Sequence, residues 1–174
     1  HEAGSLAGTL GLGKLICLYD DNGISIDGSV DGWFSEDVPA RFEAYGWRVI
    51  RNVDGHDADE ISQALHNAVD SDGRPTLVCC RTTIGFGSPN KQGTAGVHGA
   101  ALGEDEIAAT REALGWKLPA WEIPAECYDA WNQLQRGQDS QQSWQQDYER
   151  FAAAQPVRAE EFSRRMAGEL PQDW

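Results

Sequence analysis

The pattern of apolar and polar residues in the first half of the chain predicts three β-strands. Residues 15–19 and 76–80 are short apolar runs that end in polar residues, and residues 47–53 form another strand-like segment. The run at residues 15–19 is continuously apolar, which is typical of a strand buried on both faces of a parallel sheet. We therefore expect helices to cover both faces of that sheet.

Helices are expected before and between these strands. Residues 1–13 combine small and apolar residues with glycines, so we expect a helix that packs tightly against its neighbours and stops at Gly13. A second helix should begin near Ser35, where Asp37 suits the positive end of the helix dipole, and should close at Gly46.

A third helix should follow the second strand. Asp57 and Glu60 are spaced as a capping box, and residues 72–73 supply a stop signal. The apolar residues that recur on one helical face are Ile61, Ala64, Leu65 and Ala68. Strand, helix, strand, helix, strand in this order favours βαβ units with right-handed crossovers. The predicted fold class is therefore α/β, a parallel sheet with helices on both faces.

The second half of the chain changes character at residue 82. Glycine recurs without a period through residues 82–103, so we expect a loop, and loops longer than about 12 to 15 residues are often functional. A helical tail should follow, near residues 104–114, 124–134, 143–153 and 159–167. The Gln-rich residues 133–146 are interpreted as a solvated connection between helices. The tail helices should be packed by Trp116, Trp121, Trp131 and Trp144.

The charge of the chain argues against two classes of partner. Twenty-eight acidic residues against 14 basic ones give a formal charge of −14, which repels nucleic acid backbones and anionic lipid surfaces. No apolar run approaches the roughly 20 residues that span a bilayer, so we expect no membrane association. Any phosphate ligand would need positive charge from a metal, from helix N-termini, or from another part of the protein.

The cysteines predict a cytoplasmic protein. Cys17, Cys79 and Cys80 lie in the apolar strand-like runs, Cys127 lies on a tail helix, and no pairing suits a metal. We expect reduced, buried thiols.

An Asn-Gly pair at residues 22–23 is the first candidate for chemistry. Read alone it signals a turn, but it follows the first strand, and ligands of parallel sheets bind beyond the carboxyl ends of the strands. The amide oxygen of Asn22 and the main-chain carbonyl of Ile24 are suitable ligands for Mg²⁺, which takes about six oxygens. A carboxylate, a diphosphate and water would have to complete that shell.

Six segments of the chain together carry a family resemblance. They read His-Glu-Ala-Gly-Ser-Leu-Ala-Gly, Tyr-Asp-Asp-Asn-Gly-Ile-Ser-Ile-Asp-Gly, Arg-Phe-Glu-Ala-Tyr-Gly-Trp, Asp-Gly-His-Asp, Ile-Gly-Phe-Gly-Ser-Pro-Asn-Lys and Leu-Pro-Gln-Asp-Trp. In order and spacing they resemble transketolase, most closely the bacterial type, over essentially the whole chain. The resemblance implies a thiamine-diphosphate-binding fold in a fragment of a longer protein. Residues 1–116 would be the C-terminal part of the diphosphate-binding domain, and residues 117–174 a helical extension toward a pyrimidine-binding domain.

The resemblance also implies roles for individual residues. Asn22 and the carbonyl of Ile24 would bind the cation that anchors thiamine diphosphate, and Ile26 would lean on the cofactor rings. His98 would contact cofactor and substrate and assist proton transfer. Glu2 would join a carboxylate network that links the two active sites of a homodimer.

Other residues near these segments are given different interpretations. Without the resemblance, His98 reads as a loop histidine that meets solvent, and His66 as a structural residue within a helix. His56 begins a helix, so we expect it to serve capping and loop structure outside the site. Arg81 stands where the family more often has lysine. The two side chains are both cationic but differ in geometry, so no contact with cofactor or phosphate is assigned to Arg81.

The implied reaction is reversible transfer of a two-carbon ketol group from a ketose phosphate to an aldose phosphate. It would use thiamine diphosphate with Mg²⁺, Ca²⁺ or another divalent cation. The family's third cation ligand is an aspartate in a Gly-Asp-Gly motif that precedes the segment beginning at His1, so we expect this chain alone to hold Mg²⁺ weakly. A related ketol transferase, such as dihydroxyacetone synthase, and a non-catalytic fragment remain as alternatives.

Overall fold

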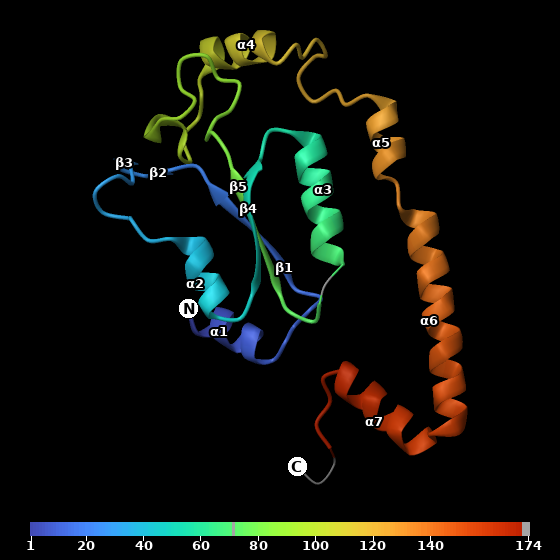
Figure 1. Ribbon diagram of the computed structural model, residues 1–174. Helices are drawn as coiled ribbons and strands as arrows, with labels where there is room; N and C mark the ends of the chain where they lie inside the picture. Colours follow the sequence, from blue (N-terminus) through green and yellow to red (C-terminus); the bar gives the residue numbers. More distant parts are fainter. Residues whose placement is uncertain (71, 172–174) are drawn as a thin grey trace. The chain divides into compact units, whose positions relative to one another are not determined.

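The chain folds as two compact units, His1–Lys117 and Leu118–Trp174, which are described separately (Figure 1). The structure is a computed structural model that describes residues 1–70 and 72–171. The end of the Leu-Pro-Gln-Asp-Trp segment, residues 172–174, lies outside the described residues.

The first unit is built on a three-stranded parallel sheet. Its strands are β1 (Ile16–Asp21), β4 (Arg48–Asp54) and β5 (Thr76–Arg81), in the order β1-β5-β4. The predicted parallel α/β sheet is therefore confirmed. The prediction that the first strand is buried on both faces is wrong, because β1 is at an edge of this sheet and Leu18 is 59% exposed. The continuously buried strand is the central strand β5, in which residues 76–80 are all buried.

Side chains of β5 point alternately into two apolar clusters, one on each face of the sheet. Val78 and Cys80 pack with residues of α3 (Ala58–Val69). Leu77 and Cys79 pack with residues of α1 (Glu2–Thr9) and with partly buried side chains of α2 (Val38–Ala44), which the ribbon shows across the sheet from α3 (Figure 1). Helices thus cover both faces, as predicted.

Helix α1 is shorter than expected but packs as closely as its glycines indicated. It ends at Thr9, and the left-handed backbone of Gly11 at φ +60° turns the chain, so the predicted stop at Gly13 is wrong. A Cβ on Gly8 would lie 1.8 Å from the backbone oxygen of Tyr45. Position 8, where α1 contacts the turn after α2, can therefore be occupied only by glycine.

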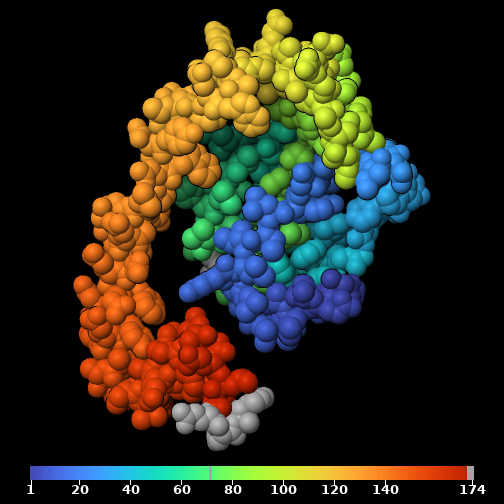
Figure 2. Space-filling view, turned by 180° about the vertical axis from the view of Figure 1, so that it is seen from behind, coloured from blue at the N-terminus to red at the C-terminus, as the bar shows by residue number. Residues whose placement is uncertain are grey.

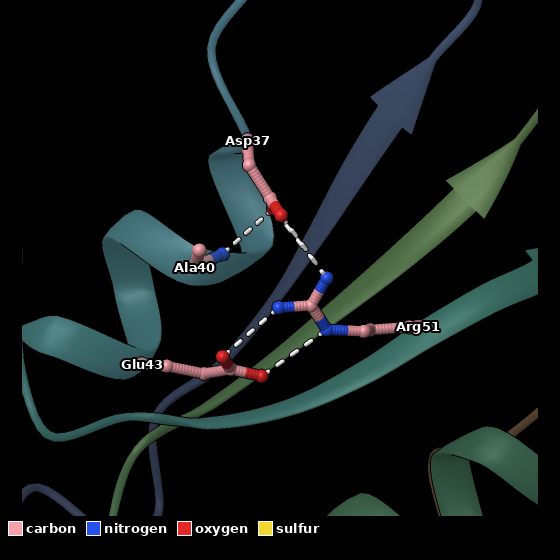
Figure 3. Close-up of polar contacts among 4 residues, drawn as sticks. All are labelled: Asp37, Ala40, Glu43 and Arg51. Carbon is pink, nitrogen blue, oxygen red and sulfur yellow. Dashed lines mark hydrogen bonds and ion pairs between the residues drawn. The ribbon is translucent and has the colours of Figure 1, made fainter.

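Helix α2 is fixed to β4 by a cluster of charged side chains (Figure 3). The carboxylate of Asp37, the N-cap, accepts a hydrogen bond of 2.8 Å from the backbone nitrogen of Ala40, so the helix begins after Asp37 and not at Ser35. The guanidinium of Arg51 in β4 donates two hydrogen bonds to Glu43, at 2.9 and 3.1 Å, and lies 3.4 Å from Asp37. The hydrogen bond from Ala40, helped by Arg51, lowers the pKa of Asp37.

Half of the predicted capping box of α3 is present. A carboxylate oxygen of Asp57 accepts a hydrogen bond from the backbone nitrogen of Glu60, at 3.0 Å. The carboxylate of Glu60 does not return to Asp57; it accepts a hydrogen bond of 2.8 Å from the backbone nitrogen of Asp54. The helix is therefore tied to the end of β4. On the predicted apolar face Ala64 and Ala68 are buried, whereas Leu65 is 37% exposed.

The predicted loop at residues 82–103 holds one short 3₁₀ turn, η1 (Ala95–Val97), and α4 (Glu104–Ala113) follows it.

The second unit contains α5 (Ala125–Trp131), α6 (Leu134–Ala154) and α7 (Pro156–Met166). The Gln-rich residues 133–146 were predicted to be a connection, but all except the N-cap residue lie within α6. None of the helices in the described ranges combines the length and apolarity needed to cross a membrane.

Two of the tail tryptophans do not pack as predicted. Trp121 and Trp131 are 98% and 86% exposed. The second unit is held together between α6 and α7, where Trp144 stacks on Tyr148 at 5.4 Å between ring centroids and Tyr148 lies 5.9 Å from Phe162.

All four cysteines are free thiols, but they differ in burial. Cys79 and Cys80 are buried and Cys17 is half-buried, whereas Cys127 is exposed, contrary to the expectation of buried thiols throughout.

Candidate functional site

The candidate site lies at the edge of the sheet where all three parallel strands end. Asn22 follows the last residue of β1, His56 lies two residues beyond β4, and Thr82 follows β5. Two contacts join the ends of β1 and β5. The Thr82 hydroxyl donates a hydrogen bond to the carboxylate of Asp20, and the Thr82 backbone nitrogen donates one of 3.4 Å to the oxygen of Asp21. Asn22 therefore lies beyond the carboxyl end of a parallel strand, where ligands of such sheets bind, as expected.

The Asn-Gly pair forms a tight turn that links the two residues of the predicted cation site through the backbone nitrogen of Ile24. The side-chain oxygen of Asn22 accepts a hydrogen bond from the backbone nitrogen of Ile24 at 2.9 Å. Gly23 between them has φ +68°, a conformation that favours glycine. An amide oxygen has two lone pairs, so Asn22 can close the turn and still offer an acceptor to a cation. The turn and ligand interpretations are thus compatible.

A short antiparallel hairpin follows this turn and carries the third predicted residue. Strands β2 (Ile24–Ser25) and β3 (Gly28–Ser29) pair with each other, and Ile26 lies between them, 73% exposed. In both views this hairpin lies beside the loop of residues 82–103 (Figure 1 and Figure 2). Sequence reasoning missed the hairpin, although an Asp-Gly pair at residues 27–28 is a recognised signal for one.

The oxygen donors at the turn suit a hard divalent cation in kind but not in number. Asn22 offers an amide oxygen and Ile24 a main-chain carbonyl, both neutral hard ligands. Within residues 1–70 and 72–171, no three His, Cys, Asp or Glu side chains are grouped so that they could hold a metal ion. The carboxylate of Asp20 is hydrogen-bonded to Thr82. A cation here would need further ligands, such as phosphate oxygens.

The structure does not bring the other two predicted residues into contact with Asn22. His98 ends the 3₁₀ turn η1, its backbone nitrogen donates a hydrogen bond of 3.0 Å to Ala95, and its side chain is exposed. Glu2 is exposed in the first turn of α1, and the neighbouring His1 ring lies 3.0 Å from the hydroxyl of Tyr45. Tyr45 precedes β4, so Glu2 lies near the edge where the strands begin, away from the edge of Asn22.

A cavity of about 470 Å³ lies at the ends of β4 and β5. Its lining includes Asp54, His56, Glu60, Arg81, Thr83 and Phe86. The imidazole Nε2 of His56 accepts a hydrogen bond of 2.8 Å from the backbone nitrogen of Thr83, and its ring stacks on Phe86 at 3.9 Å between centroids. Sequence reasoning placed His56 outside the site in a loop-building role, and the observed contacts have that character.

A buried carboxylate that sequence reasoning missed closes the loop on α4. Glu106 is 8% exposed and accepts hydrogen bonds from the Ser88 hydroxyl and from the backbone and side-chain nitrogens of Asn90, both at 2.9 Å. These hydrogen bonds lower the pKa of Glu106 to about 2, and the bond from Ser88 has the largest effect. The ammonium of Lys91 also donates a hydrogen bond of 2.7 Å to the oxygen of Leu102. Nothing in the spacing of these residues signals the contact.

Comparison with known proteins gives a consistent result along the chain. The family model described as the thiamine diphosphate binding domain of transketolase matches residues 1–171. Over all 174 residues the chain is 59% identical to transketolase 1 of Vibrio parahaemolyticus and 54% identical to transketolase 2 of Escherichia coli. In both cases it covers 26% of the relative, so the chain spans about a quarter of the length of these proteins.

Solved structures show the same similarity in three dimensions. A transketolase from Leishmania mexicana matches 99% of the chain with a TM-score of 0.91 at 37% identity. A transketolase from Pichia stipitis, in complex with sedoheptulose-7-phosphate, matches 99% with a TM-score of 0.89 at 41% identity. The chain covers 26% of each of these structures.

Proposed function

Because the chain belongs to the transketolase family, we propose that it is part of an enzyme that reversibly transfers a two-carbon ketol group from a ketose phosphate to an aldose phosphate. The observation that carries this proposal is 59% identity over the full 174 residues, which include the strand-end turn at Asn22. In this assignment residues 1–116 are the C-terminal part of the diphosphate-binding domain, and residues 117–174 lead toward a pyrimidine-binding domain. The enzyme would act as a cytoplasmic homodimer.

The turn at Asn22 would hold the cation and the diphosphate of the cofactor. Thiamine diphosphate supplies the nucleophilic carbon and the electron sink when it is bound. The side-chain oxygen of Asn22 and the carbonyl of Ile24 would bind Mg²⁺ or a similar cation. Ile26, exposed between β2 and β3, would cover the cofactor rings with apolar surface. These roles fit the hard oxygen donors and the exposed apolar side chain found there.

His98 would act at the reacting groups, and Glu2 would act at a distance from them. An exposed imidazole on a loop beside the hairpin can bind a substrate hydroxyl and take up or return its proton near neutral pH. Glu2 would act at a distance, through a network of carboxylates between two active sites of the dimer. Its exposure in the first turn of α1 leaves it available to a second subunit.

The decisive test places this chain in a complete enzyme. In a chimera, these 174 residues replace the aligned segment of the Vibrio parahaemolyticus transketolase 1, and two-carbon transfer between sugar phosphates is measured. We expect transfer to be retained, and Asn22→Ala to lower the cation affinity of the chimera and its activity together. A folded chimera without transfer activity would contradict the proposal. Transfer that prefers formaldehyde as acceptor would favour a dihydroxyacetone-synthase-like enzyme.

A second test addresses the isolated chain. Two neutral oxygens should hold Mg²⁺ weakly, so calorimetric titration of the 174-residue chain with thiamine diphosphate and Mg²⁺ should show weak binding or none. That outcome agrees with a fragment that is non-catalytic by itself. Tight binding would contradict the inference that two neutral oxygens are the only ligands this chain offers to Mg²⁺.

A further inference from the structure

We propose that His56 is a positioning residue that fixes the beginning of the 82–103 loop through an unprotonated Nε2, and thereby fixes the place of His98. The importance of His98 rests on the proposed function. The structural coupling from His56 to His98 rests on contacts within the chain alone.

The backbone holds His56 firmly at the end of β4. The backbone nitrogen of His56 donates a hydrogen bond of 2.9 Å to the side chain of Asp54, and that of Gly55 donates one of 2.8 Å to the oxygen of Arg81 in β5. A Cβ on Gly55 would lie 2.5 Å from a methyl carbon of Thr82. The chain therefore needs a glycine here to bring His56 against the residues that follow β5.

The imidazole of His56 contacts both ends of one turn in the loop. Its Nε2 accepts a hydrogen bond of 2.8 Å from the backbone nitrogen of Thr83, and its ring stacks on Phe86 with an interplanar angle of 15°. The backbone nitrogen of Phe86 in turn donates a hydrogen bond of 3.1 Å to the oxygen of Thr83. A ring nitrogen that accepts a hydrogen bond carries no proton, so the ring is neutral and protonated at Nδ1.

This turn contacts the segment that carries His98. The oxygen of Ile84 accepts a hydrogen bond of 2.8 Å from the backbone nitrogen of Gly93. Gly85 has φ +67°, and a Cβ there would lie 2.9 Å from a methyl carbon of Val97, the residue before His98. A shift of the turn therefore moves the surface on which Val97 packs. His56 touches none of the proposed ligands, which is why we assign it positioning and not catalysis.

Two substitutions separate the contacts of His56. His56→Phe keeps an aromatic ring to stack on Phe86 but removes the acceptor for Thr83. His56→Gln removes the ring but keeps an acceptor of similar reach. In the full 174-residue chain, NMR reports the tautomer of His56, the exchange of the Thr83 amide and the ring signals of His98. The amides of β5 serve as the control for the fold.

We expect Nε2 of His56 to be unprotonated in the unmodified chain. In the Phe variant the Thr83 amide should exchange roughly two- to tenfold faster, the range of one net hydrogen bond, and the His98 signals should shift while the β5 amides do not. The Gln variant should restore the protection of Thr83. Unchanged Thr83 and His98 signals in the Phe variant, or a proton on Nε2, would overturn the proposal.

The chimera gives a readout that a merely structural role would not produce. There His56→Phe should lower kcat several-fold at unchanged thermal midpoint, and His56→Gln should recover part of that loss. Equal losses in both variants would contradict a role for the acceptor. If the unmodified chimera is inactive, the proposed function fails, whereas the coupling of Thr83 and His98 to His56 is still decided by NMR.

Discussion

The hydroxyl of Ser88 donates a hydrogen bond to the carboxylate of Glu106, 18 residues further along the chain. Asn90 adds two more donors to the same carboxylate, so the Gly-rich loop is closed by a buried charge that three hydrogen bonds satisfy. This explains two polar residues of the Ile-Gly-Phe-Gly-Ser-Pro-Asn-Lys segment as structural. Their partner lies outside that segment, on α4.

The first prediction concerns stability in acid. Hydrogen bonds lower the pKa of Glu106 to about 2, from about 4.5 in the unfolded chain. A lowered carboxyl pKa contributes stability that is fully present above pH 4.5 and is lost as the pH falls from about 4.5 to about 2. Glu106→Gln should be less stable than the unmodified chain at pH 7, and that difference should shrink toward pH 2. Urea unfolding at a series of pH values measures both effects.

A matched substitution isolates the contribution of the buried carboxylate. Glu112→Gln changes an exposed carboxylate on the same helix and should leave most of the acid dependence intact. If Glu106→Gln and the unmodified chain lose stability in parallel as the pH falls, Glu106 does not contribute this pH dependence.

The second prediction compares two glycines of α1. A Cβ on Gly8 would lie 1.8 Å from the oxygen of Tyr45, whereas one on Gly4 would meet the ring of Tyr45 at 3.4 Å, an ordinary contact. Gly8→Ala should therefore destabilise the first unit by about 1 to 3 kcal/mol, the range for overpacking of a well-packed contact. Gly4→Ala should cost little or stabilise the helix by up to about 1 kcal/mol. Chemical denaturation measures the free energy of unfolding of both variants. Equal losses of stability would contradict the close contact of Gly8 with Tyr45.

The apolar runs, the helical periodicity, and the capping and stop signals between elements predicted most of the first unit. The alternation of strands and helices, and the small residues of α1, led to a parallel sheet with a closely packed helix, as observed. Burial of β1 could not be predicted, because an apolar run does not reveal whether its strand is central or at an edge. The order in which strands pair is a property of the whole sheet. In the second unit, the Gln-rich residues interpreted as a connection lie within α6 instead, because glutamine is a good helix former.

The candidate site was predictable only where it depends on local sequence. Asn22 and Ile24 are two residues apart, and one turn brings them together. The bond from Ser88 to Glu106 and the contact of His56 with Thr83 join residues 18 and 27 positions apart. Such contacts depend on the path of the loop, which no short-range pattern specifies.

The third prediction concerns the thiols. Burial raises the pKa values of Cys79 and Cys80, which lowers the fraction of reactive thiolate, whereas Cys127 is exposed. At pH 8 a thiol reagent should modify Cys127 first and half-buried Cys17 more slowly. Cys79 and Cys80 should react only on unfolding. Mass spectrometry of the partly labelled chain gives the order in which the cysteines react. The variant Cys127→Ser should abolish the fast phase of labelling. Rapid labelling of Cys79 would contradict its observed burial.

The last prediction tests the cation site with a gain of affinity. Asn22→Asp keeps an oxygen that can accept the hydrogen bond from Ile24 and adds the anionic ligand that the turn lacks. Ligand charge raises cation affinity, so binding of Mg²⁺ by the 174-residue chain should strengthen on the order of tenfold. Asn132 offers a matched control, because its side chain accepts the same kind of bond, from Leu134 at 3.2 Å, in the second unit. Asn132→Asp adds the same charge and should leave Mg²⁺ affinity unchanged in calorimetric titration. Equal affinities in the two variants would mean that the cation does not bind at Asn22.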